Sequence, residues 1–142
     1  MLEPARAVAV DLPVDDPQAD LDDYAALVVA ALEGADENVV VVGHSMGGLV
    51  APLVAARRPV RAATFLCSPI PEPGRSMNQQ READSSMMLG ALAGHLSDAG
   101  NGLKACEAEG ARKAFFHACP ELIADWGVRL LRPQSGVPTA QP

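Results

Sequence analysis

The chain has 142 residues, of which 49% are hydrophobic and 20% charged, a composition typical of one soluble globular domain. Its formal net charge is −7 and it has no basic cluster, so neither nucleic acid nor an anionic membrane is expected as a partner. The apolar runs fall short of the roughly 18 residues of a membrane span, and the three cysteines lack the spacing of a zinc site.

The first half of the chain alternates three apolar runs with two helical patterns. Continuously apolar runs are typical of strands buried on both faces, and the intervening helices can serve as right-handed crossovers, so parallel pairing is predicted. Pro52 should kink the second helix because proline removes a backbone hydrogen bond. The strands are predicted near residues 6–10, 39–42 and 61–67, and the helices from Leu21 to about Glu33 and from Gly48 to about Arg58.

The character of the sequence changes after residue 74. Residues 75–131 contain no clear strand, and their apolar spacing predicts a helical cap region. Residues 132–142 lack a pattern and are expected to be an irregular tail. We therefore expect an α/β core at 1–74, followed by cap and tail; the expected cap helices lie near residues 87–96, 104–117 and 121–131.

A nucleophile motif lies between the second predicted strand and the helix after it. Gly43-His44-Ser45-Met46-Gly47 has the form G-x-S-x-G, in which a sharp turn lifts a serine hydroxyl above a sheet. Ser45 is expected to adopt a positive φ, for which Gly43 and Gly47 leave room. The backbone N–H of Met46 should point to where an oxyanion would form. Ser45 is thus the candidate nucleophile and Met46 the candidate oxyanion donor.

The base and the acid of a catalytic triad are harder to place. His117, with Asp84 or Asp98, would keep the chain order serine, aspartate, histidine. However, His117 lies in a predicted helix beside two phenylalanines, where a locally bonded cap histidine is the competing interpretation. His95 lies in a glycine-interrupted segment, and the side chain of His44 should point away from the serine hydroxyl. We therefore expect neither triad partner in this chain, with His117 as the weak candidate, and no histidine within hydrogen-bonding distance of the serine.

The remaining reactive side chains have structural interpretations. Cys67 ends a predicted strand and is expected to be a small buried residue. The acidic stretch at residues 15–23 matches no calcium-loop spacing and is interpreted as a solvated face with a helix cap. No metal site is predicted. The methionines Met77, Met87 and Met88 are expected to fill space between cap and core.

The motif and its surroundings resemble the α/β-hydrolase superfamily, in its small esterase and hydroxynitrile-lyase-like branch. The matching segments are residues 8–13, 42–48, 69–74 and 131–134. The resemblance implies a longer chain with more strands, an earlier segment for the second oxyanion N–H, and a triad acid and histidine after the cap. We therefore interpret the chain as a partial α/β-hydrolase, truncated at both ends.

The resemblance implies a serine hydrolase of carboxylesterase type that acts on small-molecule esters and needs no cofactor. Because base and acid are not found, the chain alone should be nearly inactive. Two alternatives stay open: hydroxynitrile-lyase or perhydrolase chemistry on the same triad, and a non-catalytic remnant or interaction module. A cytoplasmic location is expected because no signal pattern opens the chain and the cysteines suggest no disulfide framework. The sequence does not indicate an oligomeric state.

Overall fold

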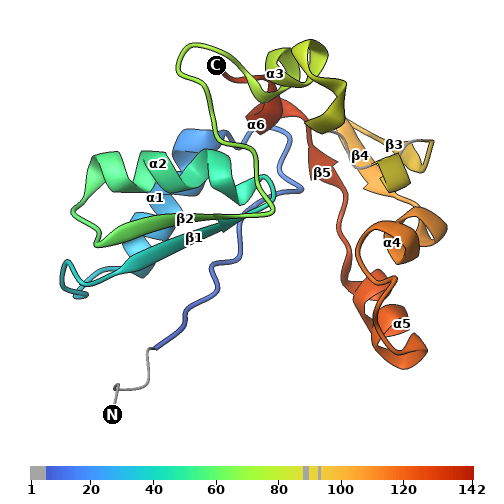
Figure 1. Ribbon diagram of the computed structural model, residues 1–142, viewed down its shortest axis with the longest axis horizontal. Helices are drawn as coiled ribbons and strands as arrows, with labels where there is room; N and C mark the ends of the chain where they lie inside the picture. Colours follow the sequence, from blue (N-terminus) through green and yellow to red (C-terminus); the bar gives the residue numbers. More distant parts are fainter. Residues whose placement is uncertain (1–5, 88–89, 93) are drawn as a thin grey trace. The chain divides into compact units, whose positions relative to one another are not determined.

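The computed structural model of the protein describes residues 6–87, 90–92 and 94–142 (Figure 1). The described residues form two compact units. Unit 1 contains residues 6–13 and Leu21–Ile70, and unit 2 contains Val14–Asp20 and Pro71–Pro142. Within the described part of the chain, no helix combines the length and apolar character that crossing a bilayer requires. The boundaries expected at residues 74 and 131 stay predictions.

Unit 1 is built on two parallel strands, β1 (Val40–His44) and β2 (Ala62–Leu66), joined by the helix α2 (Gly47–Arg57). This is the predicted strand–helix–strand order, and α2 continues past Pro52. The helix α1 (Leu21–Ala31) packs on α2, as Figure 1 shows. The buried core of unit 1 consists of one aromatic and five aliphatic side chains from these two helices: Tyr24, Ala25, Leu49, Val50, Ala51 and Val54.

The strand expected at residues 6–10 does not form. This run pairs with no strand among the described residues, and Figure 1 draws it as coil. Its Val8 side chain is 52% exposed. An apolar run becomes a strand only where a neighbour offers backbone groups to it, and the space between this run and β1 is a cavity lined by Val8 and Val40.

Two arginines at the end of α2 tie it to α1. The guanidinium of Arg58 donates to the carbonyl oxygens of Leu32 (2.7 Å), Ala35 (3.1 Å) and Asp36 (2.7 Å), just beyond the end of α1. These carbonyls follow the last helical turn, where unpaired acceptors and the negative end of the helix dipole both favour a cation. Arg57 forms an ion pair of 2.5 Å with Asp22 in the first turn of α1.

Unit 2 contains a three-stranded antiparallel sheet, which corrects the expectation of a purely helical cap and an irregular tail. β3 (Leu96–Gly100) and β4 (Leu103–Cys106) form a hairpin. Its turn residues, Asn101 and Gly102, have φ values of 52° and 78°, as a type I′ turn requires. β5 (Gln134–Ser135), in the expected tail, pairs with β4, and a short helix follows, α6 (Val137–Ala140).

Of the three helices expected in this part of the chain, only the one at residues 121–131 forms over nearly its expected length. The expected helix at 87–96 lies partly outside the described residues; its described part contains two short 3₁₀ turns, η1 (Ser85–Met87) and η2 (Gly90–Leu92), and the start of β3. The expected helix at 104–117 shortens to α4 (Ala108–Ala114), because residues 103–106 pair as β4. The helix expected at 121–131 is confirmed as α5 (Glu121–Leu130).

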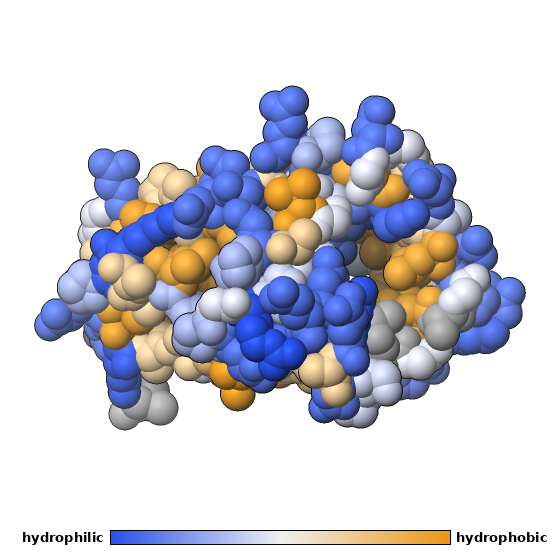
Figure 2. Space-filling view, turned by 90° about the horizontal axis from the view of Figure 1, so that it is seen from above, coloured by the Kyte–Doolittle hydropathy of each residue, from blue (hydrophilic) through white to orange (hydrophobic). Residues whose placement is uncertain are grey.

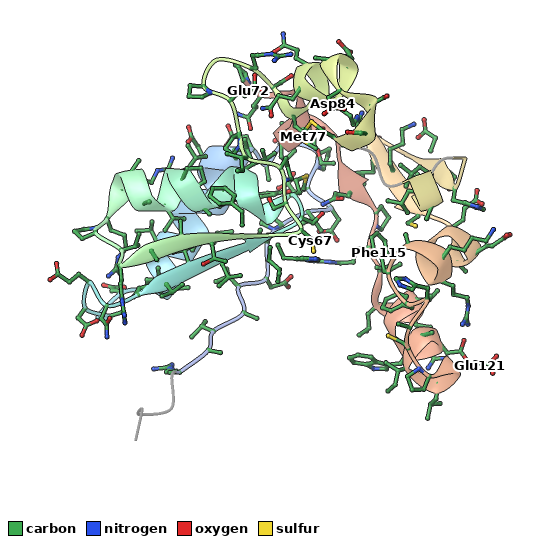
Figure 3. The ribbon with its side chains drawn as sticks, viewed as in Figure 1. Cys67, Glu72, Met77, Asp84, Phe115 and Glu121 are labelled. Carbon is green, nitrogen blue, oxygen red and sulfur yellow. The ribbon has the colours of Figure 1, made fainter. Side chains whose placement is uncertain are left out.

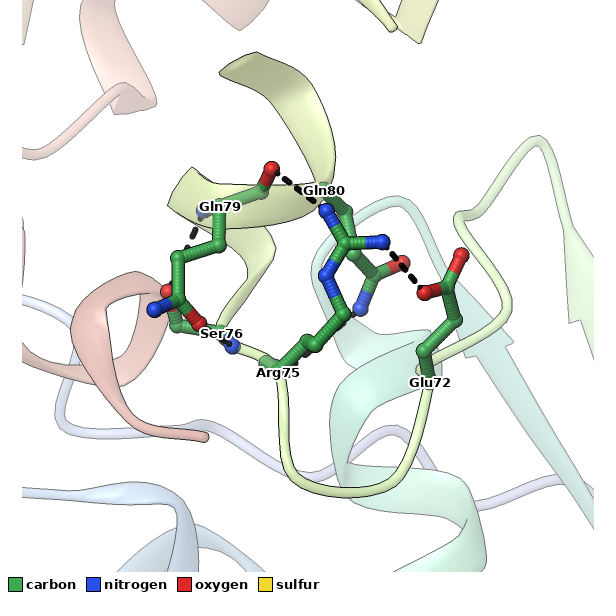
Figure 4. A network of polar contacts seen from close by, with 5 residues as sticks. All are labelled: Glu72, Arg75, Ser76, Gln79 and Gln80. Atoms are coloured by element: carbon green, nitrogen blue, oxygen red, sulfur yellow. Dashed lines mark hydrogen bonds and ion pairs between the residues drawn. The ribbon is translucent and has the colours of Figure 1, made fainter. Parts of the chain in front are cut away.

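The first helix of unit 2, α3 (Met77–Ala83), begins with a reciprocal cap (Figure 4). The Ser76 hydroxyl accepts from the backbone N–H of Gln79 (3.2 Å), while the Gln79 side chain accepts from the backbone N–H of Ser76 (2.9 Å). Arg75 adds an ion pair of 2.6 Å to Glu72 and donates to the Gln79 carbonyl oxygen at 3.0 Å. The polar groups here serve the helix terminus.

Residues 14–20 interrupt unit 1 in sequence but belong to unit 2. The carbonyl oxygen of Val14 accepts from the backbone N–H of Ser135 at 2.7 Å, next to the strand β5. Asp15 pairs with Arg132 at 3.4 Å. The second unit is therefore assembled from two distant stretches of the chain.

Candidate active site

Ser45 occupies the turn between β1 and α2, where the motif predicts it. Its φ is +51°, so the expected positive φ is confirmed, and the residue is exposed. The backbone N–H of Ser45 donates to the carbonyl oxygen of Leu66 at the end of β2 (3.1 Å), and its own carbonyl accepts from Gly48 in α2 (3.1 Å). Both ends of the turn are thus fixed by backbone hydrogen bonds, which hold a conformation that L-residues disfavour.

Two glycines, Gly43 and Gly48, make this turn sterically feasible. Gly43 belongs to the G-x-S-x-G motif, and Gly48 follows it. A β-carbon on Gly43 would lie 2.5 Å from the carbonyl oxygen of Gly47, so residue 43 has to be glycine. A β-carbon on Gly47 itself would meet nothing within 4 Å. The second close approach is at Gly48, where a β-carbon would come 1.7 Å from the Ser68 hydroxyl oxygen. The expectation that Gly47 leaves room for the turn is therefore corrected to Gly48.

The backbone N–H of Met46 is available for an anion. Met46 is the N-cap of α2, with φ −59° and ψ −21°, and its side chain makes no capping bond. Within the described residues its N–H has no acceptor, as is usual for the first N–H groups of a helix. The positive end of the helix dipole adds to this donor. The geometry of Met46 therefore suits one half of an oxyanion hole.

Cys67 follows β2 directly and lies beside the candidate nucleophile. The parallel register pairs His44 with Leu66, so Ser45 and Cys67 come one position later on neighbouring strands. Like Ser45, Cys67 has a positive φ (45°), and it is exposed, which corrects the expectation of a buried residue. Figure 3 shows it at the tip of the β2 arrow. The carboxyl ends of both strands therefore present a reactive side chain in a left-handed conformation.

None of the three histidines is shown to act on Ser45. His44 precedes it on β1 and is exposed. His95 and His117 belong to unit 2, whereas Ser45 belongs to unit 1. His95 is half-buried, with its Nδ1 3.7 Å from a carboxylate oxygen of Glu107. His117 lies in the turn between α4 and α5, which corrects its expected helical position, and it is exposed.

The two aspartates considered as triad acids are engaged locally in unit 2. Asp84 accepts from the backbone N–H and the hydroxyl of Ser86, at 2.9 and 2.6 Å, and these bonds lower its pKa. The pKa of Asp98 is lowered first by the Gly100 N–H (2.8 Å) and then by the nearby charge of Lys104. Among the described residues, neither carboxylate forms a hydrogen bond or an ion pair with His117, and each stabilises its own turn. Across the described ranges, no group of three potential metal ligands occurs.

A family model described as the alpha/beta hydrolase family matches residues 2–142, so the chain belongs to this family. The resemblance inferred from the motif is thereby confirmed, including its α/β fold. No curated protein sequence is significantly similar to the chain. The strand–turn–helix site at Ser45 therefore belongs to a chain of the alpha/beta hydrolase family.

Several solved structures share the fold. A polyneuridine aldehyde esterase variant is 20% identical with a TM-score of 0.67, over 92% of this chain and 57% of that chain. A methylesterase from Arabidopsis is 19% identical with a TM-score of 0.58, over 84% of this chain and 48% of that one. A tomato methylketone synthase complexed with β-ketoheptanoate is 20% identical with a TM-score of 0.60, over 84% and 49%. The chain thus spans about half the length of these solved chains.

Proposed function

We propose that the chain carries the nucleophile half of a serine hydrolase of carboxylesterase type. The observation that supports this most is the positive φ of Ser45, which is exposed between β1 and α2 in a chain of the alpha/beta hydrolase family. A left-handed serine at this place costs free energy, and such strain is concentrated at functional sites. A serine in an ordinary loop would not require this strained, left-handed backbone conformation.

In the proposed reaction, the Ser45 hydroxyl oxygen attacks the carbonyl carbon of an ester. The ester C=O becomes an oxyanion that the Met46 N–H stabilises, and the alcohol leaves when the carbonyl reforms. Water then releases the acid from the acyl-serine. Removing one oxyanion donor typically costs about 10²–10³ in rate, so Met46 alone would supply only part of the stabilisation.

The serine proton needs a base, which we propose is supplied from outside residues 1–142. An unassisted serine hydroxyl is a weak nucleophile, and triad members act as a unit. The solved chains with this fold are about twice as long as the segment that they share with the present chain, which leaves room for a histidine and an acid. The chain by itself is then nearly inactive. If the chain is active by itself, His117 is the candidate base.

The proposed substrate is a small carboxylic ester, and the proposed location is the cytoplasm. Two of the similar solved proteins are named esterases, and the third was solved with β-ketoheptanoate. The proposed chemistry needs no cofactor, because nucleophile, base and oxyanion donors suffice for ester cleavage. The net charge of −7 makes nucleic acid and anionic lipid poor partners.

Two other functions remain as alternatives. Hydroxynitrile-lyase or perhydrolase chemistry would use the same Ser45, and the groups that distinguish these reactions are not identified in this chain. A non-catalytic remnant or interaction module is favoured by the two-stranded sheet of unit 1, whose Val40 and Val42 side chains are 48% and 56% exposed.

The test compares two proteins, each with its Ser45→Ala partner: the 142-residue chain, and a chimera in which it replaces the matching half of the Arabidopsis methylesterase. We expect only the chimera to hydrolyse p-nitrophenyl acetate and to react with a fluorophosphonate in a Ser45-dependent way. A folded chimera without Ser45-dependent reaction would favour the remnant. Cyanide release from a cyanohydrin would favour the lyase. Ser45-dependent turnover by the 142-residue chain alone would place the base within it, and His117→Ala would be the next variant.

A further inference from the structure

The turn between β3 and β4 places an amide side chain next to an accessible main-chain nitrogen. Asn101 and Gly102 form its two-residue loop, and both residues are exposed. Among the described residues, the Asn101 side chain forms no hydrogen bond or ion pair. A β-carbon on Gly102 would meet nothing within 4 Å, so the space beside this residue is open. Neither the amide nor the nitrogen that follows it is shielded.

The two residues of this loop are suited to its backbone conformation. Both have a positive φ, 52° at Asn101 and 78° at Gly102, and asparagine and glycine adopt such values most readily. Asn101-Gly102 is the only asparagine–glycine pair in the sequence. The pair also has a chemical consequence, because glycine has no β-carbon that would keep its nitrogen away from the preceding side chain. The residues that favour the turn therefore bring a weak nucleophile close to an amide carbonyl.

The hairpin that carries this loop opens at little cost. All five residues of β3 are exposed, and its pairing with β4 is irregular between Asp98 and Gly100. The turn is held by an exposed hydrogen bond from the Gly100 N–H to Asp98 (2.8 Å), and the exposed ion pair between Asp98 and Lys104 (3.5 Å) contributes little. Such a hairpin opens locally with far less free energy than unfolding requires. The Gly102 nitrogen therefore gains access to the Asn101 side chain while the rest of the protein stays folded.

We propose that Asn101 is a site of spontaneous deamidation, at which the folded protein converts asparagine to isoaspartate and aspartate through a cyclic imide. In the first step, the main-chain nitrogen of Gly102 loses its proton to hydroxide and forms a bond to Cγ of Asn101. The bond between Cγ and Nδ2 breaks, and the leaving nitrogen takes up a proton from water and departs as ammonia.

The second step opens the imide with water. Much of the face that Figure 2 draws is hydrophilic, and an exposed turn in such a surface meets the water that this step consumes. Cleavage of the bond from Cγ to the nitrogen gives aspartate. Cleavage of the bond from the main-chain carbonyl carbon to the nitrogen gives isoaspartate, in which the main chain runs through Cβ. The two steps together consume one water and release one ammonia, and they need no oxidant or reductant.

The other two asparagines of the chain lack this arrangement. Asn38 precedes a β-branched residue, and its side-chain oxygen accepts from Arg61 (3.2 Å). Asn78 lies in α3, and the next main-chain N–H, that of Gln79, donates to the Ser76 hydroxyl (3.2 Å). A bulky neighbour hinders the attack at the first position, and a hydrogen bond restrains the nitrogen at the second. The two residues are therefore internal controls for Asn101.

Isoaspartate should loosen the sheet of unit 2. It adds one carbon to the main chain between residues 101 and 102, so the loop no longer matches the pairing of Gly100 with Leu103. Leu103 also pairs with Ser135 of β5, so the change reaches the third strand. The product carries an additional negative charge in a chain whose formal net charge is already −7.

The test incubates the folded 142-residue chain at mildly alkaline pH and follows each asparagine by peptide mass spectrometry, in which deamidation adds about 1 Da. We expect Asn101 to convert at least about tenfold faster than Asn38 or Asn78. Isoaspartate is identified by methyl transfer from S-adenosylmethionine with an isoaspartyl methyltransferase. Gly102→Asn should slow conversion at residue 101 about tenfold or more, because asparagine keeps the positive φ but brings a side chain. Circular dichroism verifies its fold.

A second measurement separates the altered main chain from the added charge. The isoaspartate form is isolated by ion exchange and compared with Asn101→Asp, which has the same charge and an ordinary main chain. Amide hydrogen exchange along β4 should be about tenfold or more faster in the isoaspartate form than in the unmodified chain. In Asn101→Asp it should stay as in the unmodified chain, because aspartate also tolerates a positive φ.

Four outcomes would overturn the proposal. Equal conversion of the three asparagines would show that the turn has no special reactivity. Conversion of Asn101 only in the urea-unfolded chain would show that the folded hairpin prevents the attack. Aspartate without isoaspartate would indicate direct hydrolysis instead of an imide. Equal exchange in the isoaspartate form and in Asn101→Asp would contradict the loosening of the sheet. Because no readout uses ester hydrolysis, these results are independent of the outcome for Ser45.

Discussion

Gly43 and Gly47 approach each other so closely that a β-carbon on residue 43 would stand 2.5 Å from the carbonyl oxygen of residue 47. This contact closes the turn that presents Ser45. The relationship is not symmetric, because a β-carbon on Gly47 would meet nothing within 4 Å. The two motif glycines therefore have different structural roles, and substitution can separate them.

Gly43→Ala should lower the free energy of unfolding by about 1–3 kcal/mol, the usual cost of forcing a methyl group into a packed site. Gly47→Ala is the matched control. It should leave stability unchanged or raise it by up to about 1 kcal/mol, because alanine favours a helix and the position is open. Urea unfolding followed by circular dichroism measures both. Equal destabilisation by the two changes would contradict the asymmetry.

Ser45→Gly should be more stable than Ser45→Ala by about 1 kcal/mol. Glycine adopts a positive φ without the steric cost that alanine incurs there. Ser97, which is exposed on β3 and has no positive φ, supplies the comparison. There the order should reverse, because glycine in a strand is less stable than alanine. If alanine also proved the more stable residue at position 45, the left-handed conformation would not be the state in solution.

Arg58→Ala should lower the free energy of unfolding by about 1–3 kcal/mol, since it removes three hydrogen bonds from a charged donor to carbonyls beyond α1. Arg61→Ala is the control, because Arg61 makes a single exposed side-chain contact of 3.2 Å with Asn38. Its effect should stay below about 0.5 kcal/mol. Thermal and urea unfolding report both. Arg58→Lys should recover little of the loss, because an ammonium cannot reach three carbonyls.

The pKa of the Asp98 carboxyl group should lie below the ordinary aspartate value, because the Gly100 N–H and then Lys104 favour the ionised form. A depressed pKa in the folded state adds stability above the unfolded value, and this contribution is lost as the pH falls through the folded pKa. The β3–β4 hairpin should therefore loosen at acidic pH, as the pH falls through this lowered pKa. NMR titration of the carboxyl carbon measures the midpoint.

Lys104→Ala should raise the Asp98 midpoint only in part, because the N–H of Gly100 is the larger cause. Asp98→Asn should remove the hairpin's acid-dependent loosening. A midpoint at the ordinary value in the unchanged chain would show that the turn hydrogen bond is not formed in solution.

The Ser45 turn could be predicted from sequence because its requirements are local. A strand, a G-x-S-x-G turn and a helix follow within a few residues, and a positive φ at Ser45 follows from that order. Which glycine is packed could not be predicted, since the close approach at Gly48 depends on Ser68, which follows a different strand. The exposure of Cys67 could not be predicted for a similar reason, because it depends on what covers the end of β2.

The hairpin of unit 2 has a signal in the amino-acid sequence. Asn101-Gly102 favours a type I′ hairpin, and the next three residues, Leu103-Lys104-Ala105, alternate in polarity as a half-buried strand does. β5 has no such signal, because its two residues pair with Leu103 and Lys104, which are distant in the sequence. The run at residues 6–10 shows the converse case. Its composition predicts a strand, but a strand also needs a partner, and composition does not provide one.

The pairing of residues 14–20 with the end of the chain affects how the protein can be made and divided. Asp15 and Arg132 lie 117 positions apart, so loop closure between them is entropically costly and late. During synthesis, the early segment must wait for nearly the whole polypeptide to leave the ribosome. A protease that cuts near residue 70 would release a C-terminal piece without the Val14 carbonyl that the Ser135 N–H contacts. The C-terminal half of the gene, expressed alone, would therefore lack residues 14–20 of unit 2, whereas the N-terminal half would encode unit 1 together with that segment of unit 2.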